Sequence, residues 1–352
     1  MQEKNPFAIN FGAIPTQYIA RNLITDEIIT ELESEKVQNP CFMLSGVRGS
    51  GKTVTMTAIE REMREKDDWI VIGLNPQLDM IESLVAKLYD THEFINKFIS
   101  ANLNLSQFGI GLAVESKPPV ADIESALEKI LAEIKKQKKR LLVTIDEVSN
   151  TQFMREFASA YQILIRNEYP IYLIMAGLYN NIHNLEDEDN LTFLYRTPKY
   201  EMEPINITLI QQRYKDLFGL DTEAAFNMAV ITKGYAFAYQ VLGKYVWDSE
   251  EKYVTDEVLA KFDEALEKYV YGKIWAELSF TDKWYLKYIA QKEVMETATL
   301  LELTKKKKNE FAQYRARLKD KGIIDVSTHG IIKMVLPRFD TFIKTRVAIE
   351  LI

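Results

Sequence analysis

Hydrophobic and polar positions along the first two hundred residues alternate between two patterns. Short uninterrupted apolar runs predict four buried strands, at 41–44, 69–74, 140–145 and 171–176. Between these runs, apolar residues recur at intervals of three and four, which predicts helices at about 56–63, 78–89, 121–136 and 151–166. Strands that alternate with helices are typical of a parallel sheet that helices cover on both faces. The fold class is therefore α/β, and we expect the sheet domain to extend over residues 1–204.

One segment of this region fits neither pattern. Residues 102–114 alternate only loosely and contain Gly109 and Gly111. We expect a hairpin or a flexible flap there.

The pattern changes after Pro204, where no strong strand signal remains until the C-terminal part. Helical periodicity predicts four helices, at 209–218, 222–232, 235–247 and 258–274. We expect an all-helical lid domain over residues 205–278. From Ser279, three helices precede two apolar stretches that flank His329-Gly330 and predict a β-hairpin. This order resembles a winged helix-turn-helix, which we expect over residues 279–352.

Composition narrows the classes of protein. The 352 residues carry a formal net charge of −7 and are 47% hydrophobic, which is typical of a globular protein and excludes a mainly disordered chain. Cys41 is the only cysteine and the three histidines are scattered, so neither a disulfide within the chain nor a zinc site is expected. Neither a signal peptide nor a membrane span is recognisable, and we expect a cytoplasmic protein without membrane contact.

The most specific motif lies between the first strand and the helix after it. Residues 46–53 read Gly-Val-Arg-Gly-Ser-Gly-Lys-Thr and match the phosphate-binding pattern G-x-x-x-x-G-K-[ST] at every defined position. Glycines let such a loop turn its N–H groups toward phosphate oxygens. Lys52 is expected to bridge the β- and γ-phosphates, and Thr53 to bind Mg²⁺. The residues expected to contact ATP or ADP are Gly46, Val47, Arg48, Gly49, Ser50, Gly51, Lys52, Thr53 and Val54.

The second half of an ATPase site is expected after another buried strand, and the run at 140–145 supplies it. Asp146 would hold Mg²⁺ through water, as a metal-site partner of Thr53. Glu147 would orient and deprotonate the attacking water. Thr144 is a polar interruption in this otherwise apolar strand.

An arginine often neutralises the charge that develops on the γ-phosphate during hydrolysis. Arg196, about twenty residues after the strand at 171–176, is the candidate, with Arg48 and Arg166 as alternatives. The expected catalytic residues are therefore Glu147, Lys52 and Arg196.

These motifs resemble the AAA-type P-loop ATPases of the origin-recognition and initiator-like branch, and more narrowly bacterial ATP-binding proteins with a C-terminal winged helix. Asn5-Pro6-Phe7, Phe11-Gly12, Pro15 and Ala20-Arg21 resemble the family's N-terminal box, which packs near adenine. Residues 232–243, TKGYAFAYQVLG, resemble its lid helix. The resemblance extends over essentially the whole chain.

Two departures from the family pattern concern hydrolysis. Many relatives carry a lid arginine that touches the γ-phosphate, whereas residues 235–242 contain none. The fourth strand ends in Ala176-Gly177-Leu178, which offers no polar sensor, although Asn180 and Asn181 lie just beyond. The resemblance therefore implies slow turnover, with the nucleotide state acting as a conformational switch.

Charge is distributed unevenly along the chain. Residues 279–352 carry 15 Lys plus Arg and 9 Asp plus Glu, a net of +6, whereas the other residues carry 29 against 42. Contact with DNA is therefore expected only in the C-terminal domain. In its third helix, Phe311, Tyr314 and Leu318 should face the core, and Gln313 and Arg317 should read bases. Phosphate contacts are expected from Arg315, Lys319, Lys321 and, on the hairpin, Lys333.

The sequence thus predicts an ATPase whose nucleotide state switches the binding of double-stranded DNA. Two alternatives stay open, namely a signalling ATPase whose winged helix binds a protein partner and an inactive nucleotide-binding scaffold. Arg196 could act within one chain or, in an oligomer, on a neighbouring chain.

Overall fold

The computed structural model describes residues 4–9, 15–111, 122–189 and 191–350. Internal contacts divide the chain into two compact units. The sheet unit consists of residues 21–45 and 52–201, and the helical unit consists of residues 1–20, 46–51 and 202–352. Each is described by itself.

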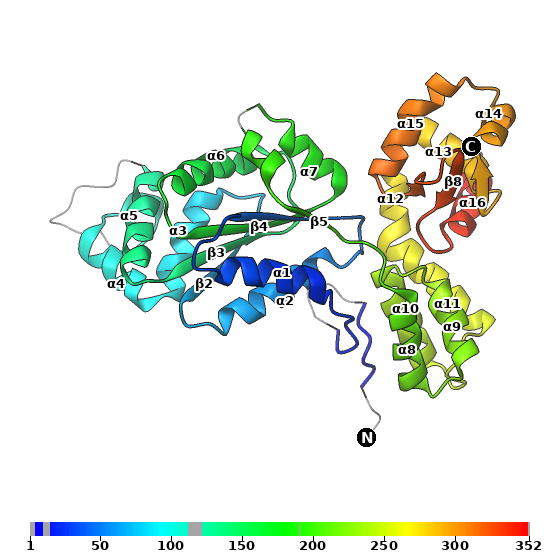
Figure 1. Ribbon diagram of the computed structural model, residues 1–352, viewed down its shortest axis with the longest axis horizontal. Coiled ribbons are helices and arrows are strands. Elements are labelled where there is room, and N and C mark those ends of the chain that lie inside the picture. The colour runs from blue at the N-terminus through cyan, green and yellow to red at the C-terminus, as the bar shows by residue number, and fades with distance from the viewer. Residues whose placement is uncertain (1–3, 10–14, 112–121, 190, 351–352) are drawn as a thin grey trace. The chain divides into compact units, whose positions relative to one another are not determined.

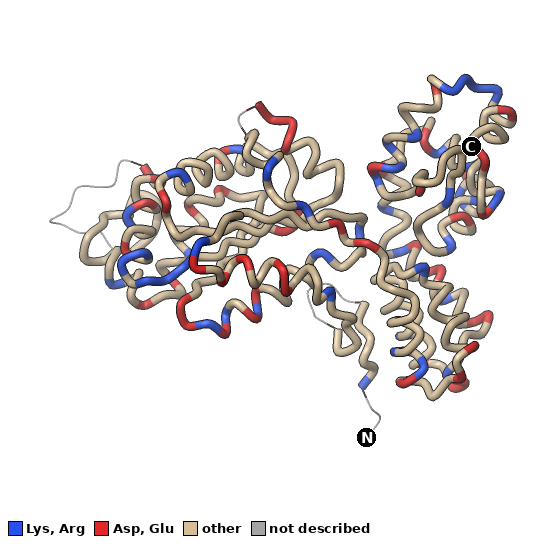
Figure 2. Tube along the Cα trace, viewed as in Figure 1, with Lys and Arg blue, Asp and Glu red and all other residues tan. Residues whose placement is uncertain are grey.

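The sheet unit is built on five parallel strands in the order β2-β3-β4-β1-β5 (Figure 1). The strands are β1 (Cys41–Ser45), β2 (Trp69–Leu74), β3 (Arg140–Ile145), β4 (Ile171–Gly177) and β5 (Lys199–Glu201). Along the three central strands, β1, β3 and β4, only Arg140 is charged (Figure 2). Strands buried on both faces require such continuous apolar runs, which is why the sequence pattern identified them.

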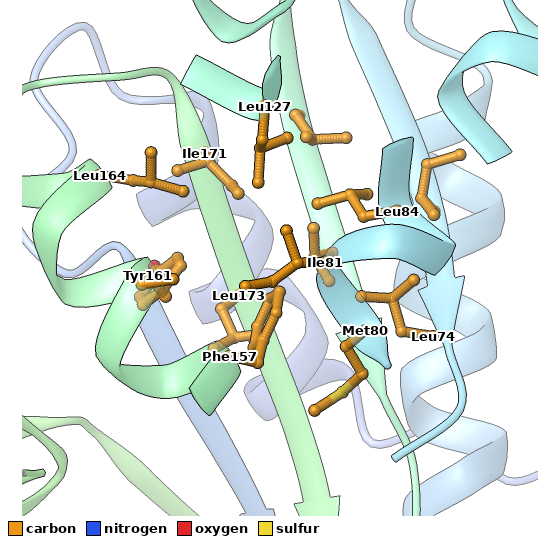
Figure 3. Close-up of a cluster of buried hydrophobic side chains, with 14 of the residues drawn as sticks. Leu74, Met80, Ile81, Leu84, Leu127, Phe157, Tyr161, Leu164, Ile171 and Leu173 are labelled. Atoms are coloured by element: carbon orange, nitrogen blue, oxygen red, sulfur yellow. The ribbon is translucent and has the colours of Figure 1, made fainter. Parts of the chain in front are cut away.

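Helices cover both faces of this sheet (Figure 1). They are α1 (Asn22–Glu33), α2 (Lys52–Arg64), α3 (Met80–Thr91), α4 (Glu93–Asn102), α5 (Ile123–Lys136), α6 (Gln152–Arg166) and α7 (Tyr179–Glu186). On one face, Ile171 and Leu173 of β4 meet Phe157 and Tyr161 of α6 in a fully buried cluster that also receives residues of α3 and α5 (Figure 3). The predicted α/β fold of this region is confirmed.

The segment at 102–114 differs from the expected hairpin over its described part. Residues 93–102 form α4, a 3₁₀ turn follows at Ser106–Phe108, and Leu103, Leu105 and Ile110 are buried in the core. The alternation that suggested a hairpin therefore reflects a helix end and a turn that pack inward. Residues 112–114 lie outside the described residues.

The helical unit contains the helices expected after Pro204. They are α8 (Ile207–Phe218), α9 (Thr222–Ile231), α10 (Ala236–Asp248), α11 (Asp256–Leu266) and α12 (Gly272–Ala276), with a π-helical turn at Glu267–Tyr271. The N-terminal segment packs on α10. Phe7 rests against Gly243, where a side chain would collide with the ring, and Gln240 accepts the N–H of Ala8 through its side-chain oxygen.

Residues 279–350 continue the same unit. They form α13 (Phe280–Ile289), β6 (Val294–Glu296), α14 (Thr297–Thr304), α15 (Lys308–Asp320), β7 (Ile324–Asp325), β8 (Ile331–Met334) and α16 (Phe339–Glu350). The predicted hairpin is confirmed as the antiparallel pair β7–β8, and β6 adds a third antiparallel strand. One hydrophobic cluster runs from α8–α12 into this segment. Tyr271 packs on Phe339 and donates its hydroxyl to the carbonyl of Pro337, so the two parts share a core.

None of the helices in the described part of the chain is both long and apolar enough to cross a membrane.

The burial of Cys41 gives a testable property of the sheet unit. This residue of β1 is 3% exposed, and burial raises the pKa of its thiol to about 12, against a smaller opposing effect of the hydrogen bond with Thr197. Because the thiolate is the reactive form, we expect a thiol reagent at pH 8 to modify the native chain far more slowly than the urea-unfolded chain. Equal rates in the two states would contradict this packing of β1.

Candidate functional site

The glycine-rich loop adopts the backbone that phosphate binding requires. Gly49 and Gly51 have φ values of +77° and +99°, which residues with a side chain rarely adopt. The loop follows β1, and α2 begins at Lys52. A loop of this kind turns successive N–H groups to one side and ends at the positive N-terminus of a helix, which suits a phosphate group.

In the sheet unit, the two predicted metal ligands are brought together. Asp146 follows directly on β3, and the Thr53 hydroxyl at the start of α2 donates to its Oδ2 at 2.6 Å, although the residues are 93 positions apart in the sequence. Two oxygens this close can share the coordination sphere of one Mg²⁺. No cluster of three or more His, Cys, Asp or Glu able to hold a metal occurs among the described residues. The pair therefore fits a Mg²⁺ whose other ligands are phosphates and water.

Glu147 is held in an unusual backbone conformation. Its φ of +54° is left-handed, and its N–H donates to Asp146 Oδ1 at 2.8 Å. The residue is exposed. Left-handed non-glycine residues are energetically costly and cluster at functional sites, where they aim a side chain. The strained turn thus presents a carboxylate next to Asp146, at the edge of the sheet where β3 ends.

A second contact between α2 and β3 was missed by sequence reasoning. The buried Thr144 hydroxyl donates to Oε1 of Glu60 at 2.5 Å. Thr144 lies two residues before Asp146, and Glu60 lies seven residues, about two helical turns, after Thr53. The Thr53–Asp146 and Glu60–Thr144 contacts therefore join α2 to β3 at two points along their length. The signal was the polar residue inside an apolar strand, because a buried hydroxyl needs a partner.

The arginine candidates lie in three different surroundings. Arg196 ends the 3₁₀ turn Thr192–Arg196, is exposed, and has no carboxylate partner within the described ranges. Arg166 ends α6, which begins after the carboxyl end of β3 and leads to the start of β4, so it lies at the sheet edge away from Asp146. Arg48 pairs with Glu277 at 3.6 Å within the helical unit. Lys199 of β5 pairs with Met43, so Arg196 is level with the start of β1 and also lies at the sheet edge away from Asp146. Arg196 is therefore compatible with a catalytic role only on a neighbouring chain.

The two asparagines just beyond the fourth strand lie at the edge of the sheet that carries Asp146. Asn180 and Asn181 are in the first turn of α7, just after the carboxyl end of β4, and both are partly buried.

Arg317, which the sequence assigns to base contacts, has a different environment. Its guanidinium donates to both carboxylate oxygens of Asp282, at 2.5–3.0 Å, and to the hydroxyl of Ser279. Asp282 is only 1% exposed and also completes the capping box of α13. The side chain therefore holds α15 against α13 and is not available to a partner on the surface.

The other proposed DNA contacts also differ in their exposure. Arg315 donates to the carbonyl of Val326 at 3.3 Å, and Lys321 is partly buried after the end of α15. Gln313, Lys319 and Lys333 are exposed. The lysine run at 305–308 is exposed as well, and α15 begins at its last residue, Lys308. The exposed face of α15 includes the small residues Ala312 and Ala316.

The parallel sheet, the glycine loop and the Thr53–Asp146 pair together define a P-loop nucleoside triphosphatase domain. Residues 21–178 match the family described as the KAP family P-loop domain, in agreement with a P-loop NTPase domain in this part of the chain. Residues 268–343 match a domain of unknown function, DUF8462. Comparison with curated protein sequences finds no match.

A solved structure supports the fold along nearly the whole chain. The Aeropyrum pernix ORC2 protein, solved as ADPNP–ADP complexes, superposes with a TM-score of 0.56 and 14% identity over 97% of this chain and 98% of that one. The chain therefore shares the fold of that protein. AMPPCP-bound DnaA from Aquifex aeolicus gives a TM-score of 0.45 at 12% identity, over 96% and 97% of the two chains, and is too distant to add to this conclusion.

The placement of Arg317 can be tested by stability. We expect Arg317→Ala to lower the free energy of unfolding of the helical unit by about 2–3 kcal/mol, because it leaves the buried Asp282 carboxylate without its cation. Gln313→Ala, on the exposed side of α15, should change it by less than about 0.5 kcal/mol. Urea unfolding followed by tryptophan fluorescence measures this, since Trp247, Trp275 and Trp284 belong to the helical unit. Equal stability of the two variants would return Arg317 to the candidates for base contact.

Proposed function

We propose that the chain binds ATP with Mg²⁺ and hydrolyses it slowly, and that the nucleotide state switches a DNA-binding winged helix formed by residues 279–352. The observation that carries the nucleotide part is the phosphate-binding loop followed by the Thr53–Asp146 contact. The ORC2 neighbour was solved with ADPNP and ADP, in line with this proposal.

In the proposed site each residue has one task. The loop amides and Lys52 bind the phosphates, while Thr53 and Asp146 hold Mg²⁺, which supplies charge neutralisation on the phosphate oxygens. Glu147 accepts a proton from the attacking water. Residues 235–242 contain no arginine and β4 ends in Ala176-Gly177, so few groups stabilise the transition state. Slow turnover follows from that shortage, and Arg196 of a neighbouring chain in an oligomer is the candidate to relieve it.

The DNA part of the proposal rests on the shape and charge of residues 279–350. The order α13-β6-α14-α15-β7-β8, in which the hairpin β7–β8 and β6 form a three-stranded sheet, resembles the arrangement of a winged helix, and α16 follows it. Lysines gather where α14 leads into α15 (Figure 2). Lys308, Ala312 and Lys319 follow each other at helical spacing on the exposed side of α15, and the small side chain of Ala312 permits close approach to a groove.

The shared core explains how a switch could reach this surface. Arg338 forms a two-point ion pair with Asp263 of α11, and the Lys233 ammonium donates to the carbonyl of Met334 at 3.0 Å. Residues 279–350 are therefore fastened to the lid helices at several points. A nucleotide that moves the lid would move the proposed winged helix with it.

A protein partner is the second candidate function. Phe280 is 70% exposed and Leu303 is 44% exposed on the same segment, and exposed large apolar side chains favour protein contact over DNA contact. The DNA experiment below separates the two candidates.

The nucleotide proposal is tested with two substitutions. We expect Lys52→Ala to weaken binding of a fluorescent ATP analogue roughly a hundredfold, because the substitution removes the ammonium that donates to the phosphates. Glu147→Gln should bind within about threefold of the unchanged chain but release phosphate at least about a hundredfold more slowly. Phosphate release is measured with and without DNA. Unchanged affinity in the Lys52 variant would overturn the site, and absent turnover in the unchanged chain would indicate an inactive scaffold.

The DNA proposal is tested by salt dependence. Affinity for duplex DNA should fall linearly on a plot of log K against log salt. Replacing Lys306, Lys308 and Lys319 by Ala should reduce the slope by about one for each lysine that neutralises a phosphate. Lys344→Ala, an exposed lysine of α16, is the control and should leave the slope unchanged. A flat salt response would favour the protein partner.

A further inference from the structure

The first residues of α10 contact the back of the phosphate loop within the helical unit. The Tyr235 hydroxyl donates to the carbonyl oxygen of Arg48, and the N–H of Phe237 donates to the carbonyl oxygen of Gly49 at 3.1 Å. Tyr235 is 6% exposed, and burial raises the pKa of its hydroxyl far above the ordinary value. The hydroxyl therefore keeps its proton and acts as a hydrogen-bond donor.

The fit between loop and helix is close. A Cβ at Gly49 would overlap the phenol of Tyr235 and would lie 3.1 Å from Cβ of Phe237. A Cβ at Gly51 would lie 3.7 Å from that of Ala236, an ordinary contact distance. Three consecutive residues at the start of α10 thus lie against the loop, and Gly49 is required by this contact as well as by its positive φ.

The direction of these hydrogen bonds matters because a peptide unit is planar and trans. The carbonyl of Arg48 and the N–H of Gly49 belong to one plane and point in opposite directions, and the same holds for the carbonyl of Gly49 and the N–H of Ser50. A donor that fixes each carbonyl on the outside therefore also fixes the direction of an amide on the inside. The Gly49 amide, directed in this way, is one from which a phosphate would accept a hydrogen bond. The Ser50 amide donates to the Val47 carbonyl at 3.3 Å within the loop.

We propose that Tyr235 is a positioning residue for phosphate binding, which sets the direction of the Gly49 amide through the Arg48 carbonyl and lets the lid sense the nucleotide through the loop backbone. The inference rests on the proposed binding of ATP. It supplies the role that an arginine of the lid would otherwise have, without contact between the lid side chain and the nucleotide. Because coupling is reciprocal, phosphate binding must in turn stabilise the start of α10.

Tyr235→Phe removes the donor and keeps the ring. The matched control is Tyr239→Phe, one turn further along α10, because Tyr239 is equally buried and its hydroxyl has no hydrogen-bond partner among the described residues. Affinity for mant-ATP with Mg²⁺ is measured at a temperature well below the unfolding midpoint of all three chains. We expect Tyr235→Phe to bind about three- to tenfold more weakly and Tyr239→Phe to bind within about twofold of the unchanged chain. Equal affinities, or equally weakened binding in both variants, would overturn the inference.

Hydrogen exchange at the Phe237 amide reports on the contact directly. In the unchanged chain, ATP should slow exchange in a peptide that covers 235–242, and in Tyr235→Phe this protection should shrink. If the variant does not fold, the unchanged chain still decides, because ATP binding without added protection of this peptide would overturn the inference. Failure of the unchanged chain to bind mant-ATP would instead refute the proposed function.

Discussion

The tight backbone turn between β1 and α2 is the constraint on which the rest of the structure depends. A loop that offers its amides to phosphate exposes main-chain groups that no regular element satisfies, and it stays in one conformation only if both of its ends are fixed. On one side, β1 is buried on both faces and paired with β4 and β5. On the other, α2 is fastened to β3 by the Thr53–Asp146 and Glu60–Thr144 contacts. The sheet core and these two contacts therefore fix both ends of the loop.

The net charge of −7 is a sum of two unlike parts. Residues 279–352 are basic and the rest of the chain is acidic, so a polyanion would be attracted to one segment and repelled by the others. Several of these basic side chains are used inside the protein, as Arg317 on Asp282 and Arg338 on Asp263 show. The surface that remains for a partner is smaller than the residue count suggests, and it centres on the lysines that precede α15.

The fold was largely predictable because its central strands are uninterrupted apolar runs and its loop motif fixes what precedes and follows it. The missed strands, β5 and β6, have only three residues each and too little burial to leave a pattern. The motifs were sufficient to select Thr53, Asp146 and Glu147 as site residues. They did not predict the distances between these residues. Arg317 was assigned to DNA because helical spacing identifies a face and says nothing about a carboxylate 35 residues away on another helix. Pairing between distant elements is a property of tertiary structure alone.

The path of the chain through the two units has a consequence for how the protein is made. The described residues before Arg21 belong to the helical unit, and residues 21–45 belong to the sheet unit. Residues 46–51 belong to the helical unit again, residues 52–201 to the sheet unit, and the residues after Glu201 to the helical unit. Neither unit is a continuous stretch of sequence. During synthesis the strands of the sheet can pair once residue 201 has been synthesised. The phosphate loop cannot contact α10, and Phe7 cannot pack against Gly243, until those later residues have been added. The nucleotide site is thus completed late, by residues made long after those that define its motif.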